Sequence, residues 1–134
     1  MAEVVTTGSY RVERVLLMST TFNRMDYIDF GSENSITNHI SLDHKAREDN
    51  EDGKIIVTLT VRVNGLQDNE NRFTVDVKMT GIFEKDGEPP LSEDIFKNVN
   101  APAIIYPFIR EHIANLCAKA GLGNIYLPTV NFKQ

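Results

Sequence analysis

Two stretches in the middle of the chain alternate strictly between apolar and polar residues. In the first, Lys54 to Val63, every second residue is an aliphatic side chain, beginning with Ile55. The second, Phe73 to Phe83, repeats the pattern with aromatic and aliphatic residues. A period of two residues is typical of a strand with one buried face. Because the segment Gly65 to Asn71 between them is polar and turn-rich, we predict an antiparallel hairpin.

Two further strands are predicted upstream of this hairpin. Ile36, Ile40 and Leu42 alternate with polar residues, and we interpret the charged stretch Lys45 to Asp52 as the connection to the next strand. The segment Tyr10 to Phe22 is rich in β-branched and apolar residues, but its alternation breaks over residues 15–17. We therefore expect a long first strand that is partly buried on both faces, and four strands before any helix.

Helical spacing replaces the alternation after Asn100. Pro102 suits the first turn of a helix, and Gly121 suits the left-handed residue that ends one. Pro107 lies within the pattern, where its missing N–H predicts either a kink or the effective start of the helix. The preceding segment, Lys85 to Val99, is predicted to be turn and loop. An apolar stripe recurs at steps of three and four residues: Ile105, Phe108, Ile109, His112, Ile113, Leu116, Cys117 and Ala120.

Four strands and one helix predict an α+β fold, in which a four-stranded antiparallel sheet is packed by one long C-terminal helix. The length of 134 residues suits a single domain, residues 1–134. One helix covers only part of such a sheet, so the apolar surface exceeds what a monomer can bury and indicates an oligomer interface or a binding site. The tail adds further apolar residues: Ile125, Tyr126, Leu127, Val130 and Phe132.

Composition and charge narrow the classes of function. The chain is 41% hydrophobic and 25% charged, as in ordinary globular proteins, and it has no run of about 18 apolar residues that would insert into a membrane. A net charge of −5 without clustered Lys and Arg argues against nucleic acid as a partner. Residues 1–10 lack a signal-peptide pattern and Cys117 is the single cysteine, so a cytoplasmic location is expected.

The sequence does not predict an enzyme, a metal site or a cofactor. His39, Asp43 and His44 contain metal-binding groups, but the two histidines would face opposite sides of one strand. Cys117 lies near the apolar stripe, where a buried, inert thiol is expected. The glycines of residues 121–123 follow a helix instead of opening one, which excludes a phosphate-binding loop.

Two motifs near the C-terminus resemble a known family. Residues 100–113 read Asn-Ala-Pro-Ala-Ile-Ile-Tyr-Pro-Phe-Ile-Arg-Glu-His-Ile, and residues 126–132 read Tyr-Leu-Pro-Thr-Val-Asn-Phe. With the order of elements, they are similar to the SecB protein-export chaperones over nearly the whole chain. The resemblance implies a bacterial, cytoplasmic homotetramer, built as a dimer of dimers, which holds unfolded preproteins in apolar grooves without ATP or any cofactor.

The resemblance directs attention to residues that contact unfolded clients. Binding of many extended chains requires apolar patches and exposed strand edges, and flexible Met and aromatic side chains let such a surface adapt. Phe22, Ile40 and Leu42 are also suited to the core, so both roles remain open for them. The predicted client contacts lie in the connection after the first strand and on the second strand: Phe22, Met25, Tyr27, Ile28, Phe30, Ile40 and Leu42.

Other positions concern assembly and the export motor. SecB proteins dock on the SecA motor partly through acidic residues of the sheet; Asp76 matches one of these, whereas Ser19 and Asn23 stand where acids are expected, which puts docking on SecA in question. Family members also continue into a further helix, so we expect a short form that lacks it. Four helical residues are predicted to pack the helix or a subunit contact: Ile109, Arg110, Glu111 and Ile113.

Three functions remain open at this point. The first is a general holdase for secretory or outer-membrane precursors. The second is a SecB-like chaperone dedicated to one client, such as an antitoxin. The third is a structural, oligomeric protein without a client, in which the surplus apolar surface serves subunit contacts alone.

Overall fold

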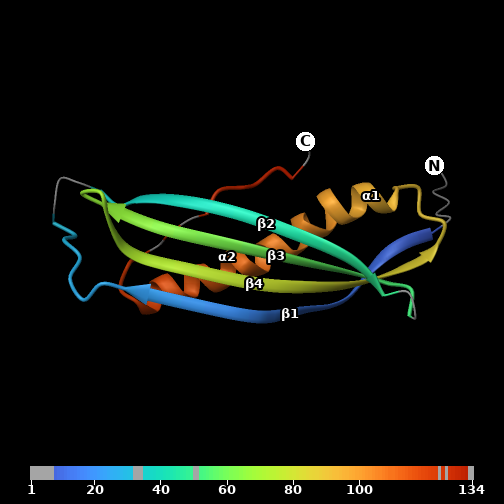
Figure 1. Cartoon of the computed structure of the whole chain (residues 1–134), viewed down its shortest axis with the longest axis horizontal. Helices are drawn as coiled ribbons and strands as arrows, with labels where there is room; N and C mark the ends of the chain where they lie inside the picture. Colours follow the sequence, from blue (N-terminus) through green and yellow to red (C-terminus); the bar gives the residue numbers. More distant parts are fainter. Residues whose placement is uncertain (1–7, 32–34, 50–51, 124, 126, 133–134) are drawn as a thin grey trace, which may run out of the picture.

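The computed structural model describes residues 8–31, 35–49, 52–123, 125 and 127–132, so Tyr126 of the tail motif lies outside the described residues. A four-stranded antiparallel sheet carries one long helix across one face, as the sequence predicted (Figure 1). The elements in chain order are β1 (Gly8–Arg24), β2 (Thr37–Asp49), β3 (Lys54–Gln67), β4 (Glu70–Gly87), α1 (Glu93–Ile95), a π-helical segment η1 (Phe96–Asn100) and α2 (Ala101–Lys119).

The sheet has the strand order β1-β4-β3-β2, and the predicted hairpin is the central pair, β3 and β4. Its turn is shorter than expected, because β3 ends at Gln67 and β4 begins at Glu70, which leaves only Asp68 and Asn69 between them. These two residues adopt positive φ values of 54° and 62°. Two positive φ values give the turn whose twist matches that of a hairpin, and Asp and Asn tolerate this conformation better than other side chains.

The prediction that Lys45 to Asp52 forms a connection is wrong, because β2 continues to Asp49. β2 is an edge strand, so charged side chains on either face reach water or a partner. Glu48, for example, accepts a hydrogen bond from Lys97 of η1. The charged segment therefore extends the sheet instead of ending it.

The long strand β1 lies at the other edge and pairs with β4. Its register shifts between Val12 and Arg14 and again between Leu17 and Ser19, so β1 contains two bulges. The segment in which the alternation breaks, residues 15–17, lies between these bulges and is itself regularly paired. Val15 and Leu16 lie on opposite faces and are both half-buried, as expected, whereas most of the rest of β1 is exposed because α2 lies over the central strands.

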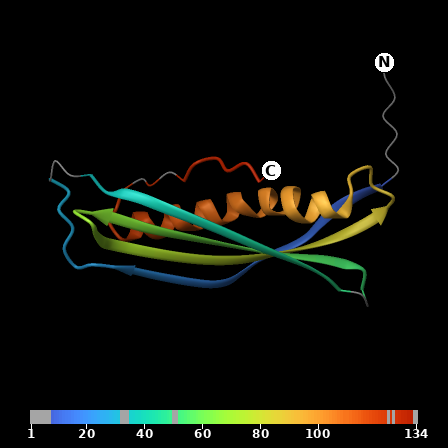
Figure 2. The ribbon, with the colours of Figure 1, turned by 45° about the horizontal axis from the view of Figure 1, so that its top comes forward.

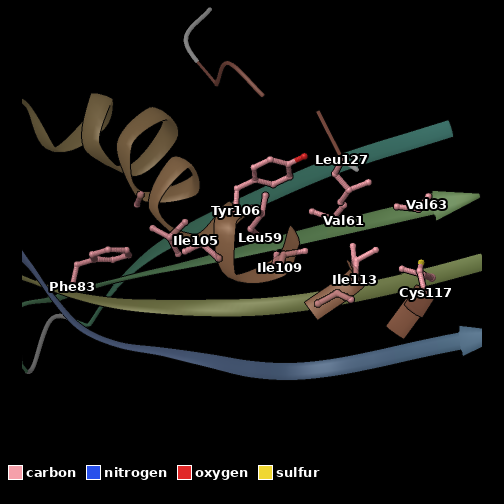
Figure 3. Close-up of a cluster of buried hydrophobic side chains, with 14 of the residues drawn as sticks. Leu59, Val61, Val63, Phe83, Ile105, Tyr106, Ile109, Ile113, Cys117 and Leu127 are labelled. Carbon is pink, nitrogen blue, oxygen red and sulfur yellow. The ribbon is translucent and has the colours of Figure 1, made fainter. Parts of the chain in front are cut away.

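The core lies between α2 and the inner faces of β3 and β4. Figure 3 shows side chains from these strands and from successive turns of α2 directed at one another. Gly81 permits this close approach, because a Cβ atom there would lie 3.0 Å from Ile105 Cδ1 and 2.7 Å from the Phe83 ring. Fully buried members include Val57, Leu59, Val61, Val63, Val75, Val77, Phe83, Ile105, Ile109, Ile113 and Cys117.

The helical region begins earlier than predicted. The Ser92 hydroxyl accepts a hydrogen bond from Ile95 N at 3.3 Å and caps α1, so part of the predicted loop is helical. α2 then runs through Pro107 without interruption, with this proline on its exposed side. The helix ends as expected at Gly121, whose φ is 72°, with Leu122 N donating to Cys117 O at 2.9 Å.

Two connections complete the fold. Because β1 and β2 form opposite edges, the chain between them crosses the end of the β3–β4 hairpin (Figure 1, left). After α2, the C-terminal tail, residues 125–132, returns along the helix (Figure 2). It is held where Tyr106 donates to Pro128 O at 2.7 Å. Within the described residues, no helix has the length and apolar content required to cross a bilayer.

Candidate functional site

The crossover between β1 and β2 displays three large apolar side chains to solvent. Met25 is 43% exposed, Tyr27 71% and Phe30 59%. We call these three residues the crossover patch. Side chains of this size are seldom so exposed together unless they serve as a contact surface. The patch also combines a flexible thioether with two aromatic rings, a composition that adapts to different apolar partners.

The backbone beneath the crossover patch is anchored to the hairpin. Ile28 is buried, and Gln67 Nε2 donates a hydrogen bond to Asp29 O at 2.9 Å. Met25 N donates to Arg72 O at 2.8 Å, and the Arg72 guanidinium also approaches Met25 Sδ at 3.8 Å. The crossover therefore holds its exposed side chains on a fixed support.

The remaining predicted contact residues lie elsewhere. Phe22 is half-buried and stacks on Phe73 with ring centroids 6.5 Å apart. Ile40 and Leu42 are half-buried on the α2 side of β2, where they pack against the core. The structure therefore separates the exposed crossover patch from residues that also support the fold, and Ile28 belongs to the second group.

A second exposed apolar area lies between α2 and β1. Val12 is 44% exposed and lies opposite buried Phe83 of β4, and Leu17 is 49% exposed and lies opposite half-buried Met79. Phe108 of α2, a member of the predicted apolar stripe, is 47% exposed, so the stripe is not buried along its whole width. Phe108 lies one turn before His112, whose Nε2 is 2.9 Å from Thr20 Oγ1 of β1, and thus on the β1 side of the helix. We call Val12, Leu17 and Phe108 the open flank.

The predicted helical positions divide into buried and exposed pairs. Ile109 and Ile113 are fully buried against the sheet of their own chain. Arg110 and Glu111 are exposed beside a depression of about 390 Å³ that Leu127 of the tail also lines. The Arg110 guanidinium lies 5.8 Å from the centre of the Tyr106 ring. Packing of α2 onto the sheet thus uses the isoleucines, and the charged pair remains at the surface.

Groups with catalytic or metal-binding potential are dispersed. In the part of the chain that the structure describes, no three His, Cys, Asp or Glu residues are grouped so that they could hold a metal ion. His44 Nε2 instead contacts Asn98 Oδ1 at 3.2 Å. Burial raises the pKa of the Cys117 thiol to about 11, so this thiol is protonated near neutral pH and is a poor nucleophile.

Asp76, the acidic residue considered for motor docking, lies on the sheet face away from α2. Its carboxylate accepts two hydrogen bonds from Arg62, with Nε–Oδ1 at 2.7 Å and Nη2–Oδ2 at 3.0 Å. The paired guanidinium compensates the negative charge. Asp76 therefore does not present a free carboxylate to a basic partner.

Comparisons with known proteins agree on one family. Residues 6–134 match the family described as preprotein translocase subunit SecB. A protein-export protein SecB of Methylobacillus flagellatus is 35% identical over 83 residues, which cover 62% of this chain and 53% of that protein. SecB 2 of Polaromonas naphthalenivorans is 28% identical over 125 residues, 92% of this chain and 76% of that protein. The alignments with Methylobacillus, Herminiimonas and Neisseria relatives span about half the length of those proteins, at 53%, 46% and 57%.

A solved structure has the same fold. The SecB-like chaperone of Mycobacterium tuberculosis, in complex with a peptide from the HigA1 antitoxin, superimposes with a TM-score of 0.77 and 14% sequence identity. The superposition covers 90% of each chain. At this identity, the likeness concerns the arrangement of the sheet and helix.

Proposed function

Because the chain belongs to the SecB family, we propose that it is an ATP-independent holdase that binds unfolded preproteins and keeps them competent for export. The family consists of chaperones and not enzymes, in agreement with the expectation from the sequence. The observation that carries the proposal is the crossover patch, in which Met25, Tyr27 and Phe30 are exposed on an anchored backbone.

The physical basis is burial of apolar surface that unfolded chains share. An unfolded client exposes apolar side chains, and covering both surfaces removes that area from water at roughly 25 cal/mol per Å². β1 and β2 form the two edges of the sheet, so their backbone groups are placed to pair with an extended client strand. Such contacts require no particular client sequence, which suits a general holdase.

The proposal includes self-association as a homotetramer, a dimer of dimers. It is supported by the open flank, where Val12, Leu17 and Phe108 are each close to half exposed in the single chain. A second copy placed there would bury apolar area that neither α2 nor the tail covers. The proposal does not include docking of SecA at Asp76, because Arg62 already holds that carboxylate.

Aggregation of a reduced, unfolded model protein, followed by light scattering, tests the holdase function. We expect suppression by the wild-type chain at equimolar to several-fold excess. Replacing the crossover patch with Met25→Ser, Tyr27→Ser and Phe30→Ser together should lower suppression by at least five-fold. Ile95→Ser, which removes an exposed apolar side chain on α1, is the matched control and should retain suppression.

Each outcome has a distinct meaning. Absence of suppression by the wild-type chain at several-fold excess would contradict the general holdase. Rescue of one specific partner, with no effect on unrelated unfolded proteins, would favour the dedicated chaperone. Equal suppression by the triple variant and the wild type would show that clients bind a surface other than the crossover patch. Circular dichroism establishes that each variant is folded.

A further inference from the structure

Figure 1 turns the sheet face away from α2 toward the viewer. The register places charged residues of all four strands on this face. Toward both ends of this face, cations are matched by acids on other strands. Arg62 binds Asp76 through two hydrogen bonds, as described above. At the other end, Lys54 Nζ donates to Glu13 Oε1 at 2.9 Å, and Arg11 Nη2 donates to Glu84 Oε2 at 2.6 Å.

The middle of the same face differs, because its cations are unmatched. Four of them make no ion pair with any residue that the structure describes, and Asp43, at the β2 edge, is the one acidic side chain in the described rows between the paired ends. The neighbours of these cations across the strands are mainly apolar side chains and threonines. The unmatched cations are Arg14, Lys45, Arg47 and Lys78.

The register places these cations around an apolar floor. Arg47 of β2 lies opposite Ile56, which lies opposite Ile82, which lies opposite Arg14 of β1. The next row runs from Lys45 through two threonines to β1. The apolar strip thus has cations at both ends of its isoleucine row, whereas the Lys45 row ends at Leu16 of β1.

A depression of about 450 Å³ lies on this strip, and Met18, Ile56, Lys45, Arg47 and Lys78 contribute to its lining. We call these five residues the cationic hollow. Met18 reaches it because of the second β1 bulge, which inserts this residue between the paired positions 17 and 19.

The polar groups of the floor are already satisfied. Thr58 and Thr80 also line the hollow, and their hydroxyls bond to each other at 2.8 Å. The hydroxyls of the floor therefore need no polar ligand, whereas the cations at its margin form no ion pair within the described part of the chain. A complementary ligand would place apolar groups on the floor and negative charges at the margin.

We propose that the cationic hollow docks an acidic segment of a partner polypeptide whose apolar side chains lie on Met18 and Ile56. The positive charge of the hollow favours an acidic ligand. A chain with net charge −5 keeps unmatched cations in one place around an apolar floor, and acidic side chains would pair with them. The contact is independent of the client surface, because the crossover patch lies at the end of the hairpin and not on this face.

A short polypeptide segment fits better than an anionic membrane or a nucleic acid. Met18 of the hollow is 56% exposed, but Ile56 and Thr80 are recessed in the strands, so the hollow offers a membrane a single large projecting apolar side chain. A long polyanion would also extend over the acidic remainder of the molecule, which repels it. A segment of about ten residues engages the hollow alone.

Fluorescence anisotropy with a fluorescein-labelled ten-residue peptide, in which Asp and Leu alternate, tests the proposal at 50 mM salt. Lys78→Glu should weaken binding at least ten-fold. The control is Lys119→Glu, which makes the same change in net charge at an exposed site on α2 and should weaken binding less than two-fold. Met18→Ser should weaken binding about three-fold, and raising salt to 300 mM should weaken wild-type binding.

Several results would overturn the proposal. These are equal effects of Lys78→Glu and Lys119→Glu, tighter binding of a peptide in which Lys and Leu alternate, or Lys78-dependent binding of phosphatidylglycerol vesicles or of a 20-nucleotide single-stranded DNA. Thermal melting verifies that Lys78→Glu is folded. Lys78→Glu should also retain suppression of aggregation, so failure here and failure of the holdase function are distinguishable.

Discussion

The two flanks of α2 lie on the same sheet but differ in what covers them. On the side away from β1, the tail buries Leu127, and Tyr106 is fixed both by Pro128 O and by the edge of the Phe132 ring, 6.0 Å away. On the side of β1, the open flank has no such cover in the described chain, and Leu17 remains half exposed. Sheet and helix alone therefore leave one flank of the fold available for another molecule.

The comparison shows that similar apolar residues can have opposite roles in one chain. Leu127 and Leu17 are the same residue type, yet one completes the core and the other faces solvent. The difference arises from the segment that follows α2, which covers one flank only. Variants that alter one flank at a time should therefore have unequal consequences.

The largest effect is expected at the covered flank. Leu127→Ala should lower the free energy of unfolding by about 3 kcal/mol, because it leaves a cavity beside buried residues such as Val61. Urea denaturation monitored by circular dichroism measures the change. A loss below about 1 kcal/mol would mean that the tail contributes little to the core.

A smaller effect is expected from the hydrogen bond that holds the tail. Tyr106→Phe removes the hydroxyl that donates to Pro128 O and should lower the free energy of unfolding by about 1 kcal/mol, the usual net contribution of such a bond. The same denaturation assay applies. Tyr10→Phe, which removes the donor to Leu91 O at the other end of the fold, provides a matched comparison.

The open flank should respond less within a single chain. Leu17→Ala should lower the free energy of unfolding by less than about 1 kcal/mol at low protein concentration, because much of the side chain is already in water. If a second copy covers this flank, the loss should grow with protein concentration by mass action. A loss as large as that of Leu127→Ala at every concentration would contradict the contrast between the flanks.

The smallest effect concerns pH. The Lys97 ammonium, which donates to Glu48, lowers the pKa of this carboxyl below its ordinary value. Its contribution to stability is therefore present above the pKa of an unfolded glutamate and is lost as pH falls through the lowered folded-state pKa. Lys97→Met should flatten this part of the stability profile between about pH 5 and pH 3. Parallel profiles for Lys97→Met and the wild type would contradict this role, and Lys119→Met is the charge control.

The sequence predicted the strands and the central hairpin because alternation records burial on one face of β3 and β4. It did not predict the length of β2, because a charged segment at an edge can satisfy both faces with water or with partners such as Lys97. The exposure of β1 was also missed. Which strand lies at an edge depends on pairing across the whole chain and not on local pattern.

The exposed part of the candidate site was predictable from composition, whereas residues whose exposure depends on the packing of distant elements were not. The composition of the crossover, with Met25, Tyr27 and Phe30 among polar residues, identified the patch before the structure placed it in solvent. Helical spacing includes Phe108 in the apolar stripe but does not reveal where the covered part of the sheet ends. The broken alternation at residues 15–17 records half-buried Val15 and Leu16 on opposite faces, and no local pattern marks the bulge after Leu17 that directs Met18 to the opposite face.

The position of β1 beside β4 also governs the order of events during folding. Arg11 and its partner Glu84 are 73 positions apart in the chain, whereas β3 and β4 meet across a two-residue turn. Closing so long a loop is entropically costly, so we expect the hairpin to form early and β1 to add late. β1 leaves the ribosome before β4, so a protein proposed to hold unfinished chains must itself pass through a stage in which β1 is unpaired.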